Sequence, residues 1–262
     1  MLAQRILSTV VLLPLVLGAA YLGGPYFAVV VAAFALLGAF EFFRMVRKAG
    51  HAPYDAIGLA LVAVLLVDAY YPYLGLWRWG IAAAVMLPLV WQILHKDAHG
   101  FLTNWALTLV GALYVGGLAA HMILLRNLPR GLPWLLLTCL VTWMCDSGAY
   151  FAGVRWGKRG FFVHISPHKT WEGAVGGFVS GLVTALLVGH WAGLALWQSF
   201  ALGVVLVLGV IFGDLAESLL KRQVGVKDSG TLIPGHGGAL DRADSLLFAG
   251  TIAYHFLLWL VL

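Results

Sequence analysis

The sequence predicts an all-α, polytopic helical membrane protein with about nine transmembrane helices. Hydrophobic residues make up 62% of its 262 residues and charged residues only 10%, and the mean hydropathy is +0.93. A water-soluble domain of this size contains about 45–50% apolar residues. Apolar segments also recur at about the 17–25 residues that a helix needs to cross a bilayer. Together these observations exclude a soluble globular protein.

Nine apolar segments support this prediction, and the short boundary near Gly23–Pro25 predicts a tight hairpin between the first two. The segments cover residues 6–22, 26–43, 56–73, 78–95, 104–125, 133–153, 173–190, 194–213 and 245–262. The first segment follows Arg5 and ends in LGAA, which is also compatible with a cleavable signal peptide. We favour an uncleaved first helix, because Arg5 is nearly alone and a second apolar segment follows at once.

The distribution of basic residues predicts the orientation in the membrane. With nine spans, thirteen of the 16 Lys and Arg lie on the side of the N-terminus, and only Arg78, Arg126 and Arg130 lie on the other. Because basic loops stay in the cytoplasm, we expect a cytoplasmic N-terminus and an external C-terminus. The two richest loops, residues 154–172 and 214–244, then face the cytoplasm. This bias explains the isoelectric point of 9.3 without a nucleic-acid partner.

Polarity divides the chain into two regions. Residues 1–132 are expected to form a transmembrane scaffold that could carry dimer contacts, and their Asp68 is expected to reach water near the end of its helix. Residues 133–262 hold seven of the eleven acidic residues and are expected to be the catalytic region. Gly173, Gly177 and Gly181 recur at four-residue spacing there, which is typical of close helix packing in lipid.

Two groups of carboxylates favour a metal site. On a helix, Asp214, Glu217, Ser218 and Lys221 share one face, near the cytoplasmic end of a predicted span. Asp241, Asp244 and Ser245 repeat the spacing at the entry to the last span. These acidic helix ends could converge on Mg²⁺, which binds few protein carboxylates and completes its shell with water and phosphates. The alternative is a salt-bridged cytoplasmic loop.

The linker KDSGTLIPGHGG, residues 227–238, favours polyphosphate binding. Successive glycines let backbone N–H groups turn toward an anion, although the segment matches neither a Walker motif nor a dinucleotide-binding fingerprint. Four cations flank or belong to this glycine-rich segment: Lys221, Arg222, Lys227 and Arg242.

The earlier cytoplasmic loop contains a second polar group. Asp146 is expected near a helix end, Ser166-Pro167 is typical of a turn, and Lys169 precedes the next span. A cation at a helix start is unfavourable unless an anion binds there too. Lys169 is therefore expected to face a phosphate, and simple membrane anchoring by positive charge is the alternative.

The run from Ser218 to Asp244, S-x-x-K-R-x₄-K-D-x-G-x₂-I-P-x-H-G-G-x-x-D-R-x-D, resembles the pattern of phosphatidate cytidylyltransferases, also called CDP-diacylglycerol synthases. The segments SPHKTWEG and DSGAYFAGVRWGK resemble other blocks of that family. The similarity covers the C-terminal half, whereas the first half agrees only in span count and polarity. Ala239 and Ala243 stand where the family usually has larger aliphatic residues, which would pack rather than react.

The resemblance implies that CTP and phosphatidate react to CDP-diacylglycerol and pyrophosphate. It also implies K⁺ as a second cation beside Mg²⁺, and a homodimer. The length and compact loops favour the cytoplasmic (inner) membrane of a bacterium, with the active site facing the cytoplasm, and an organelle membrane is the alternative. The expected catalytic residues are Asp214, Asp241, Lys221 and Arg242, and the expected metal ligands are Asp214, Asp241, Asp244 and Glu217. The expected substrate-binding residues are Asp146, Ser166, Lys169, Lys221, Arg222, Lys227, His236, Gly237 and Gly238.

Two other functions are compatible with parts of the sequence. A CTP-dependent lipid kinase would also join CTP to a membrane lipid, but it would release CDP instead of pyrophosphate. A transporter would use intramembrane charges to line a permeation path. Against the transporter, the charges gather at one membrane face, and no inverted pair of interrupted helices is found.

Overall fold

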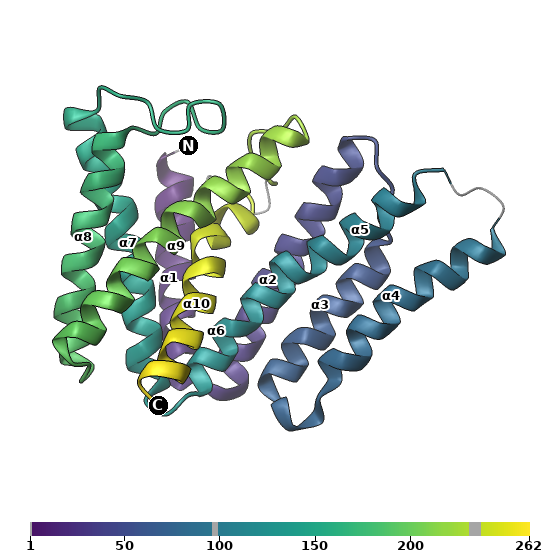
Figure 1. The fold of residues 1–262 in the computed structure, drawn as a ribbon, viewed down its shortest axis with the longest axis horizontal. Helices are drawn as coiled ribbons and strands as arrows, with labels where there is room; N and C mark the ends of the chain where they lie inside the picture. The colour runs from purple at the N-terminus through teal and green to yellow at the C-terminus, as the bar shows by residue number, and fades with distance from the viewer. Residues whose placement is uncertain (1, 96–98, 231–236) are drawn as a thin grey trace. The chain divides into compact units, whose positions relative to one another are not determined.

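A computed structural model of the chain describes residues 2–95, 99–230 and 237–262, and no strand occurs among them (Figure 1). The predicted all-α class is therefore confirmed. The helices are α1 (Leu2–Leu22), α2 (Gly24–Lys48), α3 (Asp55–Tyr70), η1 (Pro72–Leu74), α4 (Leu76–Leu94), α5 (Phe101–Ala112), η2 (Leu113–Gly117), α6 (Leu118–Asn127), α7 (Gly131–Trp156), α8 (Trp171–Trp191), α9 (Leu196–Gln223) and α10 (Leu240–Leu260).

Seven helices in the described ranges are long and apolar enough to cross a membrane, so the chain is a polytopic membrane protein. They are α2, α4, the continuous α5–η2–α6 helix, α7, α8, α9 and α10. The predicted count of nine is not confirmed. Within the described part of α1, Leu12–Leu22 is a shorter apolar helix. The 16 residues of α3 span about 24 Å, less than the roughly 30 Å of a hydrocarbon core. The side on which the N-terminus lies stays a prediction.

The chain forms two compact units. Unit 1 comprises Met1–Asn127 and Gln223–Ala243, and unit 2 comprises Leu128–Arg222 and Asp244–Leu262. The segment before α10 thus packs with the N-terminal helices, although the sequence grouped it with the C-terminal region. The division of the chain into scaffold and catalytic regions stays a prediction.

In unit 1, α3 packs against α2, α4 and α6. Its Val62 is completely buried, as are Phe43 of α2 and Leu125 of α6. The π-helical turn η2 comes very close to α3, since a Cβ on Gly116 would lie 2.8 Å from Cγ2 of Val62. Asp68 is only 8% exposed, so the expectation that it reaches water is wrong: packing around α3 covers it despite its place near the helix end.

In unit 2, α7 and α8 pack side by side through small residues (Figure 1). A Cβ on Gly173 would lie 2.9 Å from the carbonyl oxygen of Ala149, and one on Gly177 would lie 2.8 Å from that of Cys145. Gly181 faces Val207 of α9 at similarly close range. The predicted role of this glycine repeat in close helix packing is confirmed.

Helix α9 extends further than the sequence predicted. The expected span ended at residue 213, but the helix continues through Asp214 to Gln223, so Asp214 does not lie at a helix end and only residues beyond 223 leave the helix. No glycine or proline interrupts the chain between Asp214 and Gly225. Polar contacts at four-residue spacing, from Ser218 to Asp214 and from Lys221 to Glu217, further support the helix.

Candidate active site

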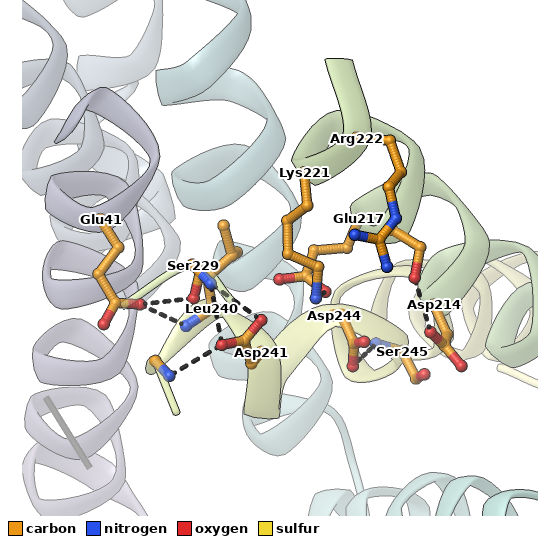
Figure 2. A network of polar contacts seen from close by, with 12 residues as sticks. Glu41, Asp214, Glu217, Lys221, Arg222, Ser229, Leu240, Asp241, Asp244 and Ser245 are labelled. Carbon is orange, nitrogen blue, oxygen red and sulfur yellow. Dashed lines mark hydrogen bonds and ion pairs between the residues drawn. The ribbon is translucent and has the colours of Figure 1, made fainter. Parts of the chain in front are cut away.

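Polar contacts around Asp214 and Asp241, two residues that the sequence singled out, form two clusters, one in each unit (Figure 2). The Asp214 cluster of unit 2 comprises Lys169, Asp214, Glu217, Ser218 and Lys221. The Asp241 cluster of unit 1 comprises Glu41, Ser229, Gly238, Leu240 and Asp241.

Asp214 lies on α9 where this helix approaches α10. A Cβ on the preceding Gly213 would lie 3.1 Å from the carbonyl oxygen of Asp244 and 3.2 Å from Cα of Ser245. Oδ2 of Asp214 lies 2.6 Å from Nζ of Lys169, and Oδ1 accepts a hydrogen bond from Ser218 Oγ at 3.5 Å. Both partners of this ion pair remain partly exposed. Lys169, a predicted phosphate-binding residue, thus contacts Asp214, a predicted metal ligand.

Glu217 and Lys221 form a second ion pair one turn further along α9. Nζ of Lys221 lies 2.6 Å from Oε2 of Glu217, whose side chain is 0% exposed while that of Lys221 is 13% exposed. A buried carboxylate requires a cation or hydrogen-bond donors at close range. Glu217, expected from the sequence as a supporting metal ligand, thus holds the Lys221 ammonium in place.

The loop between α7 and α8 is anchored at both of its ends. Thr170 caps α8 by accepting a hydrogen bond from the backbone N–H of Gly173 at 3.1 Å. Oε2 of Glu172 accepts from the backbone N–H groups of Lys158 at 3.0 Å and Arg159 at 3.2 Å. These contacts fix the residues on either side of Lys169. The sequence did not assign Glu172 a role, although its place in the first turn of a helix was a usable signal.

Ser166 and Arg222 contribute to the middle of the same loop. The backbone N–H of Lys169 donates to the carbonyl of Ser166 at 3.3 Å, which confirms the turn predicted at Ser166-Pro167. Nε of Arg222 donates to the carbonyl of Ile165 at 3.2 Å, so the last turn of α9 contacts this loop. Asp146, expected near a helix end, lies well inside α7, because the helix continues through Gly148 and Gly153 to Trp156.

In the Asp241 cluster, two carboxylates bind the segment that precedes α10. Asp241, in the first turn of α10, accepts from the backbone N–H of Ser229 at 3.0 Å and from that of Gly238 at 2.9 Å, both through Oδ2. Glu41 of α2 accepts from Oγ of Ser229 at 3.1 Å and from the backbone N–H of Leu240 at 3.0 Å, both through Oε2. Glu41 was not predicted from the sequence, although an acidic residue inside a predicted span was a signal in itself.

The remaining predicted residues lie as follows. Asp244 accepts a hydrogen bond from the backbone N–H of Ser245 at 2.6 Å. Gly237 has a φ of +87°, a conformation that glycine adopts readily, and the N–H of Gly238 points to Asp241. Lys227 and Arg242 are exposed in unit 1. His236 lies outside the described residues.

The carboxylates present fit the donor type that Mg²⁺ prefers, namely oxygen ligands. An ionised carboxylate has about four acceptor positions, so the ion pair and the hydrogen bond of Asp214 leave some of them available. No group of three or more His, Cys, Asp or Glu side chains that could hold a metal occurs in the described ranges. Mg²⁺ is typically held by one or two protein carboxylates together with water and substrate phosphates, and the predicted ligand set stays a prediction.

The similarity to known proteins extends over nearly the whole chain. A family model described as "Cytidylyltransferase family" matches residues 3–260. A phosphatidate cytidylyltransferase of Bacillus subtilis is 38% identical over 97% of this chain and 97% of its own length. Enzymes of the same name from Pseudomonas aeruginosa and Synechocystis are 38% and 32% identical, over 99% and 98% of this chain and 97% of their own lengths.

Proposed function

Because this chain belongs to the cytidylyltransferase family, we propose that it transfers the cytidylyl group of CTP to phosphatidate. The products are CDP-diacylglycerol and pyrophosphate. The observation that carries this proposal is the similarity to phosphatidate cytidylyltransferases over nearly the full length of both chains. The membrane-spanning helices suit a lipid substrate, and the cations near the Asp214 cluster suit an anionic one.

In the proposed reaction a phosphate oxygen of phosphatidate attacks the α-phosphorus of CTP. A new phosphorus–oxygen bond forms, and the bond from the α-phosphorus to the oxygen that bridges it to the β-phosphorus breaks. Pyrophosphate leaves with that bond's electron pair. Because the attacking oxygen is already anionic, no strong general base is required. Catalysis then consists of alignment and charge neutralisation of the two phosphate groups.

The cations are proposed to bind phosphate oxygens. Lys169 has a partly exposed ammonium group, and its ion pair with Asp214 can be exchanged for a phosphate oxygen. Lys221 is held by the buried Glu217, which orients its ammonium group before substrate binds. Arg222, Lys227 and Arg242 are exposed and are proposed to bind the polyphosphate of CTP. The proposed substrate-binding set also includes Asp146, Ser166, His236, Gly237 and Gly238.

We assign Mg²⁺ to Asp214 and Asp241, with Asp244 and Glu217 in support. When bound, Mg²⁺ would neutralise charge on the phosphate groups that are brought together. K⁺ is proposed as a second cation on the family resemblance. The oxygen donors of Asp214 are partly exposed, which supports its assignment, whereas the ion pair of Glu217 makes it the weakest member of the set.

The excess of basic residues on one side of the predicted spans supports a cytoplasmic active site in the inner membrane of a bacterium. CTP is a cytosolic substrate, which agrees with that orientation. A homodimer is proposed on the family resemblance, and cross-linking of the purified protein in detergent would test it.

A product assay tests the proposed function directly. Purified protein in mixed micelles is given phosphatidate, Mg²⁺ and CTP labelled on its α-phosphate. The expected result is label in the lipid phase, release of pyrophosphate and loss of both on chelation of divalent cations. In a parallel assay with an isoprenoid alcohol as acceptor and CTP labelled on its γ-phosphate, label in the lipid phase and release of CDP would identify a lipid kinase. Flux of a labelled anion into proteoliposomes without CTP would identify a transporter.

A further inference from the structure

Glu41 is a buried carboxylate in the last third of an apolar helix, and the sequence assigned it no function. It lies on α2 and is 2% exposed. A buried carboxylate in a membrane helix is costly unless donors compensate it. Its Oε2 accepts hydrogen bonds from Ser229 Oγ and from the backbone N–H of Leu240, 188 and 199 positions further along the chain (Figure 2). The donors that compensate Glu41 therefore come from the segment before α10.

Two glycines of that segment lie directly against the Glu41 side chain. A Cβ on Gly230 would lie 2.6 Å from Cδ of Glu41, and a Cβ on Gly238 would lie 2.8 Å from the same atom. Real Cβ atoms essentially never approach other atoms so closely. A side chain at either position would meet the Glu41 carboxylate, and one at Gly238 would also meet Oγ of Ser229. This close contact is separate from the anion binding that the sequence suggested for these glycines.

One hydrogen bond of Glu41 satisfies the first residue of α10. Leu240 is the first residue of α10, and its N–H is one of the helix-terminal donors that lack a partner within the helix. Asp241 follows it and binds the N–H groups of Ser229 and Gly238. Glu41 from α2 and Asp241 from α10 together hold the two ends of the segment from Ser229 to Leu240.

We infer that Glu41 is a positioning residue for nucleotide binding: through its hydrogen bonds to Ser229 and Leu240 it positions the neighbouring residues Lys227, Asp241 and Arg242. Glu41 itself is not assigned a contact with substrate. The inference rests on the proposed function, in which these three residues act on CTP and its metal.

The test compares Glu41→Ala with Glu41→Gln in the purified full-length protein. Alanine removes both hydrogen bonds, whereas the glutamine oxygen can still accept both. We expect Glu41→Ala to raise the KM for CTP by roughly tenfold or more, with the KM for phosphatidate within about twofold of the wild type. Glu41→Gln should remain close to the wild type in both constants. Ser229→Ala removes one of the two bonds and should give an intermediate KM for CTP.

Hydrogen exchange supplies a readout that does not depend on turnover. In Glu41→Ala the amides of residues 237–243 should exchange at least about tenfold faster, because the N–H of Leu240 has lost its acceptor. Amides of α7 should be unchanged. Asp68→Ala is the matched control, since it removes another buried carboxylate from the same unit at a distance in sequence from this segment. It should leave exchange in residues 237–243 and the KM for CTP unchanged.

Several results would overturn the inference. One is wild-type exchange in residues 237–243 of Glu41→Ala together with a wild-type KM for CTP. Another is an equal change of both KM values that Asp68→Ala reproduces, which would make Glu41 a residue of general stability. If Glu41→Ala does not fold, Ser229→Ala decides by the same two readouts. If the wild type transfers no cytidylyl group to phosphatidate, the proposed function fails, and the exchange comparison still decides the role of Glu41.

Discussion

The buried ion pair of Glu217 and Lys221 gives the clearest test of how much a buried ion pair stabilises unit 2. In Lys221→Met the cation 2.6 Å from Oε2 of Glu217 is removed, while the carboxylate stays at 0% exposure. Removing one partner of a buried ion pair typically costs about 3–5 kcal/mol, because the remaining charge is left buried. We expect Lys221→Met to lower the free energy of unfolding by this amount.

The reverse substitution should cost less. In Glu217→Gln the remaining Lys221 is 13% exposed, and its long aliphatic stem lets the ammonium group move toward water. The expected cost is about 1–3 kcal/mol. The double variant should be more stable than the sum of the two single effects predicts, by roughly 1–3 kcal/mol, because neither buried charge remains.

Reversible unfolding in mixed micelles, followed by helical circular dichroism, measures these differences. The chain provides a matched control in the pair of Arg47 and Asp55, whose N–O distance is 2.8 Å but whose side chains are 57% and 24% exposed. Arg47→Met should cost less than about 1 kcal/mol, as is usual for exposed ion pairs. The reasoning is refuted if Lys221→Met costs no more than Arg47→Met, or if the two substitutions at Glu217 and Lys221 are additive.

Three further predictions concern catalysis, packing and capping. Asp214→Asn and Asp241→Asn should each leave a folded, membrane-inserted protein whose cytidylyl transfer falls by orders of magnitude; near-normal turnover in either variant would contradict the metal assignment. Gly177→Ala should destabilise unit 2 by about 1–3 kcal/mol in the same unfolding assay, because its Cβ would lie 2.8 Å from a carbonyl oxygen. Gly18→Ala is the control and should not destabilise the protein, because the space around Gly18 is open. Thr170→Ala should cost about 1 kcal/mol through loss of the α8 cap, and Thr170→Ser should restore most of it; equal stability of both variants would argue against the cap.

Much of the fold could be predicted from the sequence because its signals are local. Apolar length alone predicts membrane helices, and the four-residue repeat of Gly173, Gly177 and Gly181 predicts a face for close packing, which the contacts with α7 confirm. The shared face of Asp214 and Ser218 follows from helical periodicity. Helix ends were less well predicted, as α9 shows, since a charged residue does not itself end a helix.

The candidate site could be predicted only in part. The sequence named Asp214, Lys169 and Asp241 from their residue types and neighbours, and it predicted the turn at Ser166. It did not predict that Lys169 pairs with Asp214, because these residues lie on separate segments whose approach depends on helix packing. From the sequence, Asp68 was predicted to reach water, but it is buried. The prediction failed because burial depends on the helices that pack around α3 as well as on the position of Asp68 along its own helix.

The sequence by itself therefore determined the class of the protein, its apolar helices and the residue types of its polar segments, because composition and periodicity act over a few turns of one helix. Only the tertiary structure decided that Glu41, from the second helix, accepts hydrogen bonds from Ser229 and Leu240. No periodicity links residues so far apart along the chain. Their contact exists because packing of the helices of unit 1 brings a buried carboxylate to donors that must be satisfied away from water.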